Sequence, residues 1–442
     1  MNDHVTRRYF FLGGAGLAAA SGLPARTVSL KRAGYKSPNE KLNIGGIGVG
    51  GKGYGDINSC ATENIVALCD PDEARAAKTF ARYPKATRYK DFRQMLDQEK
   101  SLDAGVVSTP DHVHGMAAAW AIERGLHVYV QKPMTRTIWE ARRLTELARK
   151  HKVATQMGNQ GHSNEGTRRL CEMIWAGEIG AVREVHAWSD RPIWPQGIPA
   201  PLAQEPVPST LDWDVWLGPA EKRPYNKGYV PFKWRGWFDY GCGALGDMAC
   251  HILDSVNWAL RLDAPSSVEC VKLEKKNSQT FPTKSILRFE FPARANMPPV
   301  TLYWYDGGLM PPRPAGIGPG VNLGDGGNGS LFICEKGILT TGCYGEKSRL
   351  LPDEKMQGYK FPDPFLTRSP GHYRDWIRAA KGGEKACSNF DYAGPFTEWV
   401  LLGTLAVRFE GKLEWDSPRM KVTNVAEANR LIKPRYRKGW KI

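Results

Sequence analysis

The chain has 442 residues, a length typical of two domains. Of these residues 41% are hydrophobic and 24% charged, a composition typical of a globular protein. Its formal net charge is +15, but residues 1–36 hold six Lys or Arg against one acidic residue, and residues 431–442 hold five against none. Because no basic helix with interleaved aromatic residues lies between these ends, the sequence argues against a nucleic-acid partner.

Residues 1–40 are predicted to be an export signal followed by a linker. Arg7 and Arg8 precede a short apolar run of small residues that ends near Ala25, the pattern of a basic region, a hydrophobic region and a cleavage site. Paired arginines in this setting are typical of a twin-arginine signal, so we expect a periplasmic or otherwise exported protein that uses the twin-arginine export machinery. The apolar run is far shorter than the ~20 residues of a membrane span, so no stable membrane insertion is expected. The alternative is a disordered basic N-terminus.

Residues 41–70 follow the pattern of a dinucleotide-binding fingerprint. An apolar run over 42–47 predicts a strand, and the glycine-rich turn after it leads into a predicted helix. In such a turn the glycines permit the tight bend, let the backbone approach a pyrophosphate and let the helix pack closely, with its N-terminal amides facing the phosphates. The candidate cofactor residues of this turn are Gly48, Gly50, Gly51 and Gly53.

Asp70 ends a second apolar run, over 65–69, about 20 residues after the glycine turn. A carboxylate at that position accepts hydrogen bonds from a ribose diol and repels a 2′-phosphate, so NAD is favoured over NADP as the cofactor. Arg75 lies nearby in the sequence and could soften this preference.

The rest of residues 41–160 alternates between predicted strands and helices, which is typical of a doubly wound parallel sheet. The predicted helices cover 73–83, 92–97, 115–124 and 138–150, and the predicted strands cover 104–108, 128–130 and 153–157. We therefore expect an NAD-binding Rossmann domain over 41–160.

Residues 161–442 are predicted to form a second, substrate-binding domain with many strands and few helices. Several apolar runs alternate with polar residues, as in a sheet with one buried face; they cover 182–189, 268–273, 285–291, 301–305 and 331–333. Residues 306–329 are rich in Gly and Pro, and we expect a lid or an intersubunit arm there.

Lys132 is the first candidate for chemistry, because it follows the predicted strand over 128–130 at the edge of the sheet where ligands bind. A lysine there can hold its ammonium beside the nicotinamide and the reacting carbon. The alternative is a solvated lysine ahead of a helix.

Asp247 and His251 are the second candidate, because they lie four residues apart on one face of a predicted helix. A carboxylate one turn before a histidine can orient the ring and stabilise its cation, which suits a general base. The alternative is an acid that serves the helix dipole beside a buried structural histidine.

Taken together, these motifs resemble the Gfo/Idh/MocA oxidoreductases, the family of glucose-fructose oxidoreductase and inositol dehydrogenase, over the whole chain after the leader. The motifs are Gly48-x-Gly50-x-x-Gly53, Asp70, Thr109-Pro110-Asp111-His112-x-His114, Gln131-Lys132-Pro133 and Gly246-Asp247-x-x-x-His251-x-x-Asp254. Segments 157–162, 216–219 and 436–440 resemble an exported branch of the family. The resemblance implies a Rossmann domain followed by an α/β domain with an open, largely antiparallel sheet, and assembly as a homo-oligomer.

The resemblance also implies roles for individual residues. It makes Lys132 the catalytic lysine, His251 the proton acceptor and Asp247 its partner, and it adds three residues to the expected cofactor site: Pro110, His114 and Gln131. The family usually has Glu before the lysine, so Gln131 keeps hydrogen-bonding capacity but removes a charge that would lie beside Lys132.

The substrate side is expected to bind a sugar or glycoside, because the stretch over 188–258 is rich in tryptophan and indole packs on the apolar faces of sugar rings. The candidate substrate residues are Asn159, His162, Trp234, Arg235, Trp237 and Tyr240. The scattered histidines lack ligand spacing, so no metal site is expected.

Three functions fit these residues. The first is an exported NAD-dependent oxidoreductase that moves a hydride between a sugar carbon and a tightly bound nicotinamide. The second is a redox-neutral glycosidase or lyase that oxidises the sugar transiently, eliminates a group and returns the hydride. The third is a non-catalytic carbohydrate-binding protein.

Overall fold

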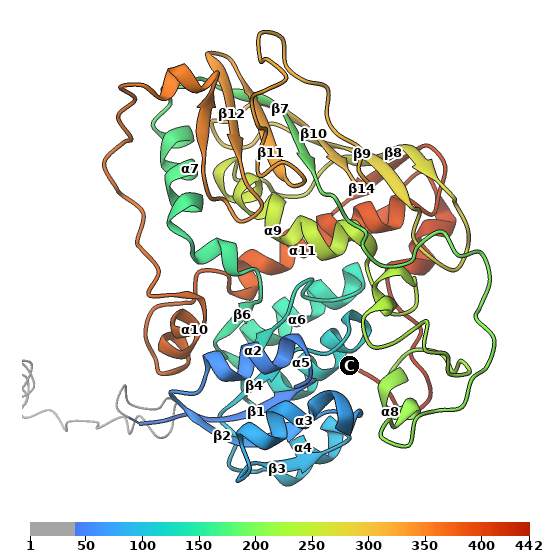
Figure 1. Ribbon diagram of the computed structural model, residues 1–442. Coiled ribbons are helices and arrows are strands. Elements are labelled where there is room, and N and C mark those ends of the chain that lie inside the picture. Colours follow the sequence, from blue (N-terminus) through green and yellow to red (C-terminus); the bar gives the residue numbers. More distant parts are fainter. Residues whose placement is uncertain (1–39) are drawn as a thin grey trace, which may run out of the picture.

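The computed structural model describes residues 40–442, which form two units, each built on one sheet (Figure 1). The predicted twin-arginine signal falls on residues 1–39 and so lies outside the described residues. Across residues 40–442, none of the helices has both the length and the apolar character that a membrane span requires.

The N-terminal unit is a six-stranded parallel sheet in the order β3-β2-β1-β4-β5-β6. Its strands are β1 (Asn43–Ile47), β2 (Asn64–Cys69), β3 (Thr87–Tyr89), β4 (Ala104–Val107), β5 (His127–Val130) and β6 (Thr155–Met157). Its helices are α2 (Lys52–Ser59), α3 (Glu73–Arg82), α4 (Phe92–Gln98), α5 (Asp111–Glu123) and α6 (Ile138–His151). The doubly wound parallel sheet expected from the alternation is thus confirmed. The short β3 escaped prediction because its three residues are exposed or only half-buried.

The C-terminal unit is a nine-stranded sheet in the order β13-β12-β11-β7-β10-β9-β8-β14-β15. Its strands are β7 (Val182–Trp188), β8 (Ser267–Glu274), β9 (Lys284–Phe291), β10 (Val300–Tyr305), β11 (Gly329–Cys334), β12 (Gly337–Thr341), β13 (Arg349–Leu351), β14 (Lys412–Asp416) and β15 (Lys421–Val422). β7 and β10 pair in parallel and the other neighbours pair antiparallel, which confirms the expected largely antiparallel sheet.

More helices follow β6 than the sequence patterns predicted, which marked only the helix that carries Asp247 and His251. They are α7 (Glu165–Trp175), α8 (Trp213–Leu217), α9 (Gly243–Ala259), α10 (His372–Ala380) and α11 (Phe390–Ala406), with 3₁₀ turns η2 (Gln160–Ser163), η3 (Lys233–Gly236), η4 (Asp353–Met356) and η5 (Ala426–Leu431). Helices α9 and α11 lie between the large sheet and the N-terminal unit (Figure 1), where α11 packs against α6, α9 and β8. Both helices are buried on nearly all sides, so their sequences lack the polar stripe that marks a surface helix.

Residues 306–328 contain no helix or strand, as the sequence indicated. Ile317 and Leu323 of this segment are buried together with Trp188 and Leu331 of the sheet. None of these residues lines the main cavity described below, so the segment is not a lid of that cavity in this structure.

Candidate active site

A cavity of about 700 Å³ opens at the carboxyl edge of the six-stranded sheet. The segments that follow β1, β2, β4 and β5 form one wall, whereas η3, α9 and the loop between β12 and β13 form another. Strand order reverses between β1 and β4, and open α/β sheets bind ligands at that point. The cavity is therefore the candidate active site.

The glycine turn after β1 is shaped for a ligand that approaches its backbone. Gly48 has φ of 76° and donates its N–H to the Cys69 carbonyl at 2.8 Å, and a Cβ on it would lie 2.7 Å from the backbone nitrogen of Thr109. A Cβ on Gly53 would lie 1.9 Å from the Gly48 carbonyl oxygen, so only glycine lets α2 begin this close to the turn. Gly48 and Gly50 line the cavity, whereas Gly51 is exposed beside the Arg75 side chain and Gly53 is buried in the first turn of α2.

Asp70 lies at the end of β2 and also lines the cavity. Its carboxylate accepts the backbone N–H groups of Gly50 at 2.9 Å and Asp72 at 3.0 Å, and burial raises its pKa to about 6 despite these bonds. The side chain of Arg75 crosses the glycine turn, where a Cβ on Gly50 would lie 2.4 Å from its Cγ. An acceptor and a cation thus lie side by side at this end of the cavity.

Gln131 follows β5 and is held by a buried carboxylate. Its Nε2 donates to Asp56 at 2.9 Å, and the same carboxylate accepts the hydroxyls of Ser108 at 2.7 Å and Tyr373 at 2.6 Å. The amide orientation is therefore set, with Oε1 facing the backbone N–H of Lys132 at 3.3 Å. A glutamate at this position would place a second carboxylate against Asp56, which gives a physical reason for the amide.

Lys132 reaches across the cavity to α9 of the other unit. Its Nζ donates to the backbone carbonyl of Asp247 at 2.7 Å and to the Asp247 carboxylate at 3.0 Å, and Nε of Arg235 donates to the same oxygen at 3.0 Å. Although burial opposes ionisation, these two cations hold the pKa of Asp247 well below its usual range. Asp247 thus places a negative charge beside Lys132, which the uncharged side chain of Gln131 does not.

His251 lines the cavity one turn after Asp247, but the two side chains do not form the expected interaction. The Asp247 carboxylate faces Lys132 and Arg235, and in the described part of the chain Nδ1 of His251 is buried with no hydrogen-bond partner. Burial and the charge of Lys132 lower the pKa of His251 well below its usual range, so the imidazole is neutral. Its ring lies edge-on to Tyr344, with the centroids 4.9 Å apart.

Asp111, the first residue of α5, is a cavity residue that the sequence did not mark as a candidate. Burial raises its pKa to about 7, with Arg235 and Lys132 acting in the opposite direction and Asp247 adding to the rise. No pattern of neighbouring residues signals this, because the groups that act on Asp111 come from distant parts of the chain.

The four aromatic and basic residues expected to touch substrate divide into two pairs. Trp234 and Arg235 line the cavity, and the Arg235 guanidinium lies over the Trp234 ring, 4.3 Å from its centroid. Trp237 and Tyr240 are fully buried in an aromatic cluster instead, so they support the wall from behind.

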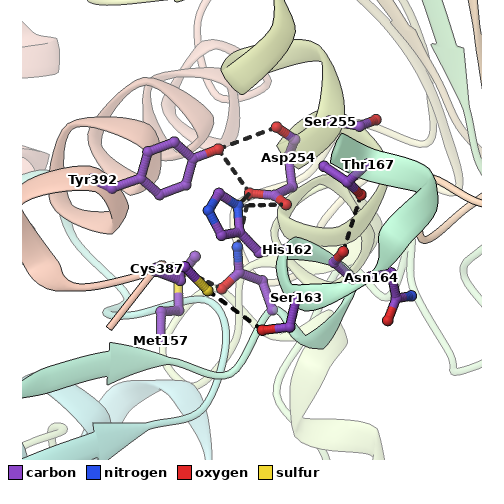
Figure 2. Close-up of polar contacts among 12 residues, drawn as sticks. Met157, His162, Ser163, Asn164, Thr167, Asp254, Ser255, Cys387 and Tyr392 are labelled. Carbon is purple, nitrogen blue, oxygen red and sulfur yellow. Dashed lines mark hydrogen bonds and ion pairs between the residues drawn. The ribbon is translucent and has the colours of Figure 1, made fainter. Parts of the chain in front are cut away.

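Asn159 and His162 do not line the cavity, although both were expected to reach substrate. Nδ1 of His162 lies 3.0 Å from the buried carboxylate of Asp254, and the hydroxyl of Tyr392 donates to the same carboxylate at 2.8 Å (Figure 2). Nδ2 of Asn159 also donates to Asp254, at 2.8 Å. The expected contacts with substrate are thus replaced by a buried polar network that joins α9 to α11 and to the end of the N-terminal sheet.

The remaining predicted cofactor residues, Pro110 and His114, both line the cavity. The ring nitrogens of His114 lie 2.8 Å from the Pro133 carbonyl and 2.7 Å from the Thr109 carbonyl, and burial lowers its pKa to about 4. Wall residues that the sequence did not reveal are Lys52, Gln160, Asn164, Phe232, Tyr344 and Glu346. Across residues 40–442, no group of three or more His, Cys, Asp or Glu is arranged to hold a metal ion.

Two family models match the chain. Residues 42–159 match the oxidoreductase family, NAD-binding Rossmann fold, and residues 186–289 match the oxidoreductase family, C-terminal alpha/beta domain. Together they cover half of the 442 residues.

Curated relatives carry two kinds of name. An inositol 2-dehydrogenase of Salmonella typhimurium is 26% identical over 151 residues, which are 33% of this chain and 45% of that protein. A glycosyl hydrolase family 109 protein of Solibacter usitatus is 32% identical over 184 residues, 38% of this chain and 40% of that protein. The chain thus spans less than half the length of these relatives.

Solved structures share the fold over most of the chain. The WlbA dehydrogenase of Bordetella pertussis, in complex with NADH and UDP-GlcNAcA, has a TM-score of 0.61 at 16% identity and covers 85% of this chain and 99% of its own. An inositol dehydrogenase homolog of Azotobacter vinelandii, complexed with NADH and myo-inositol, has a TM-score of 0.54 at 16% identity, with coverage of 86% and 100%. With both family models matched in chain order, the protein belongs to the Gfo/Idh/MocA family of oxidoreductases, with an NAD-binding Rossmann fold followed by the C-terminal α/β domain.

Proposed function

We propose that this protein is an exported NAD-dependent oxidoreductase that moves a hydride between a hydroxyl-bearing carbon of a sugar or glycoside and a tightly held nicotinamide. The observation that carries the proposal is that Lys132 and His251, from opposite units of the fold, line the same cavity as the glycine turn. A base, a cation and a dinucleotide cradle in one cavity are what oxidation of an alcohol requires.

The residues of the N-terminal unit fit NAD. The glycine turn leaves no room for a Cβ at its tightest points, and the buried Asp70 offers carboxylate oxygens at the place where the adenosine ribose would lie. When bound, the nicotinamide supplies the hydride acceptor. The end of the cavity near Pro110, His114 and Gln131 would hold that ring beside Lys132.

The other residues handle the proton and the developing charge. His251 is neutral and so can accept the proton of the substrate hydroxyl, while the ammonium of Lys132 stabilises the oxygen as it becomes negative. Asp247 and Arg235 hold Lys132 in place through the shared carboxylate oxygen. Asp247 is therefore a positioning residue for the lysine.

The proposed substrate class rests on the wall that faces His251. Trp234, Phe232 and Tyr344 offer aromatic surface, and Arg235 and Glu346 offer polar groups, the combination that binds a polyhydroxylated ring. The named ligands of the structural neighbours, myo-inositol and UDP-GlcNAcA, are consistent with this class.

A second candidate is the redox-neutral glycosidase or lyase. Two observations favour it: the relative named glycosyl hydrolase family 109, and the presence in the cavity of a carboxyl group, that of Asp111, whose pKa is raised to about 7. Transient oxidation, elimination and return of the hydride would also regenerate the cofactor at each turnover.

Export and cofactor retention belong together in this proposal. Outside the cytoplasmic membrane no pool of NAD replaces a lost cofactor, so the protein is proposed to fold and load NAD before export, and to keep it during catalysis. Homo-oligomerisation, another part of the proposal, would add contacts that help to retain it.

The experiment is to release and quantify the nucleotide of the purified protein, and then to incubate the holoenzyme with a panel of glycosides and analyse the products. We expect near-stoichiometric NAD(H) and either a keto-sugar or a cleaved sugar. A protein with no retained nucleotide and no change in any sugar would contradict the proposal and favour a non-catalytic carbohydrate-binding role.

A further inference from the structure

Asp111 lies at a junction between the two units. It is the first residue of α5, it lines the cavity, and only 4% of its surface is exposed. The charged groups that act on it are Arg235, Lys132 and Asp247, and the Cys242 thiol is its hydrogen-bond partner. It is thus part of the same cluster as the proposed catalytic lysine.

The two carboxyl groups of this cluster have opposite environments. Asp247 is bound directly by Lys132 at 3.0 Å and by Arg235 at 3.0 Å, so it is a carboxylate. Asp111 has neither cation as a hydrogen-bond donor, and burial raises its pKa to about 7. Two carboxyls of one cluster whose pKa values are pushed apart can serve different roles, one as a fixed anion and the other as a proton donor.

Oxidation of the sugar alone does not use the proton of the Asp111 carboxyl, because His251 takes the hydroxyl proton and Lys132 stabilises the oxygen. Cleavage of a glycosidic bond does need a donor, because an alkoxide is a poor leaving group. The donor must lie in the cavity, carry a proton near neutral pH and have that proton free from a stronger partner.

We propose that Asp111 is the general acid that protonates the departing oxygen when a glycosidic bond is broken in this cavity. The proposal rests on the redox-neutral form of the proposed function.

Once the sugar carries a ketone and His251 has released the hydroxyl proton to water, the C–H beside the ketone gives its proton to His251. The electron pair of that bond forms a C=C bond to the next carbon, whose C–O bond breaks, and the departing oxygen takes the proton of Asp111 and leaves as an alcohol. Water then adds to that carbon and returns a proton to Asp111, and His251 returns its proton to the carbon beside the ketone. The hydride that a bound nicotinamide takes up in the oxidation would then return to the ketone carbon, and a proton from water would complete the sugar hydroxyl.

The test compares the wild-type holoenzyme with Asp111→Asn on matched methyl and 4-nitrophenyl pyranosides. A nitrophenolate leaves without protonation, whereas a methoxide does not. We expect Asp111→Asn to lower the cleavage rate of the methyl glycoside by about 10²-fold or more, and that of the nitrophenyl glycoside by less than about tenfold. The wild-type rate on the methyl glycoside should fall above a pH of about 7, and the variant should lack this limb.

Two further measurements separate acid catalysis from a structural role. Glu346→Gln changes another cavity carboxylate, which accepts Nδ2 of Asn164 at 2.9 Å, and it should affect both glycosides alike. The difference infrared spectrum of the wild type minus Asp111→Asn should contain one carbonyl band of a protonated carboxyl that titrates near pH 7, whether or not substrate is present, because the bands of the other buried carboxyls cancel.

Equal losses on both glycosides in Asp111→Asn, or the absence of the band from the difference infrared spectrum, would overturn the role of Asp111 while the enzyme's function stands. A wild-type holoenzyme that oxidises sugars but cleaves no glycoside would instead overturn the redox-neutral function, and the role of Asp111 with it.

Discussion

The side-chain amide of Gln131 donates a hydrogen bond of 2.9 Å to the carboxylate of Asp56, which is fully buried near the start of α2. This bond joins the segment after β5, which carries Gln131 and Lys132, to α2, the helix that follows the glycine turn. It also makes Asp56 and Gln131 interdependent, because the side chain at one position must donate the hydrogen bond that the side chain at the other accepts.

Gln131→Glu should therefore destabilise the protein by about 2–4 kcal/mol, because a second carboxylate would be buried against Asp56. The double variant Asp56→Asn with Gln131→Glu restores a donor and an acceptor with their places exchanged, and it should recover a large part of the loss. Urea unfolding of the wild type, of Gln131→Glu, of Asp56→Asn and of the double variant measures the coupling free energy. Additive effects of the two substitutions would show that the pair is not coupled.

The cofactor preference should depend on Asp70 and Arg75. Asp70→Ser removes the carboxylate that repels a 2′-phosphate, so the ratio of NADP to NAD affinity should rise by about tenfold or more, and adding Arg75→Ala should abolish that rise. Titration of the apo-protein with both nucleotides measures it. Asp91→Ser is the matched control, since Asp91 caps α4, does not line the cavity and should not change the ratio. A wild type that prefers NADP would contradict the assignment of Asp70.

The proposed chemistry predicts large and separable effects on turnover. Lys132→Ala and His251→Ala should each lower kcat by about 10²-fold or more and leave NAD affinity nearly unchanged, because both side chains act on the reacting hydroxyl. Asp247→Asn should have a smaller effect, since it weakens the hold on Lys132 without removing the lysine. Single-turnover reduction of bound NAD measures these rates, and near-normal turnover in either alanine variant would remove that residue from the mechanism.

Stability should depend on pH through Asp111. Its pKa is raised from 3.8 to about 7 in the folded protein, so the folded state favours the protonated form. That contribution is fully present below a pH of about 4 and is lost as the pH rises through about 7. Asp111→Asn cannot ionise, so its stability relative to the wild type should be higher at pH 8 than at pH 5, by up to about 3 kcal/mol, which corresponds to the two pH units between 5 and the folded pKa of about 7. Thermal unfolding at the two pH values measures the difference, and an equal difference at both would contradict the raised pKa.

The export proposal is tested by replacing Arg7 and Arg8 together with alanine. The variant should remain in the cytoplasm with its leader uncleaved, because the twin-arginine machinery reads that pair. Arg26→Ala with Arg32→Ala removes two charges of the linker that follows the expected cleavage site and serves as the control. A normal periplasmic yield of the Arg7 and Arg8 variant, measured by fractionation, would show that export does not use this signal.

The sequence was sufficient for features whose pattern is visible in residues that are close together along the chain. The spacing of Gly48, Gly50 and Gly53 predicts the turn because bond geometry within a few residues decides which backbone conformations need glycine. The alternation of apolar runs with helical stretches likewise predicts the parallel sheet, since each period is a local property. Helix α11 was not predicted, because a helix buried on all sides has no polar stripe to reveal its period.

The partners of the site residues were decided only by the tertiary structure. Lys132 and Asp247 are 115 positions apart, and their pairing, rather than that of Asp247 with His251, depends on how α9 packs against the end of β5. The same holds for His162, which pairs with Asp254 away from the cavity, and for Asp111, whose raised pKa comes from burial between the two units. Burial and charge act through space, so local sequence patterns could nominate Lys132 and His251 as chemical groups, whereas the folded chain determined which groups surround them.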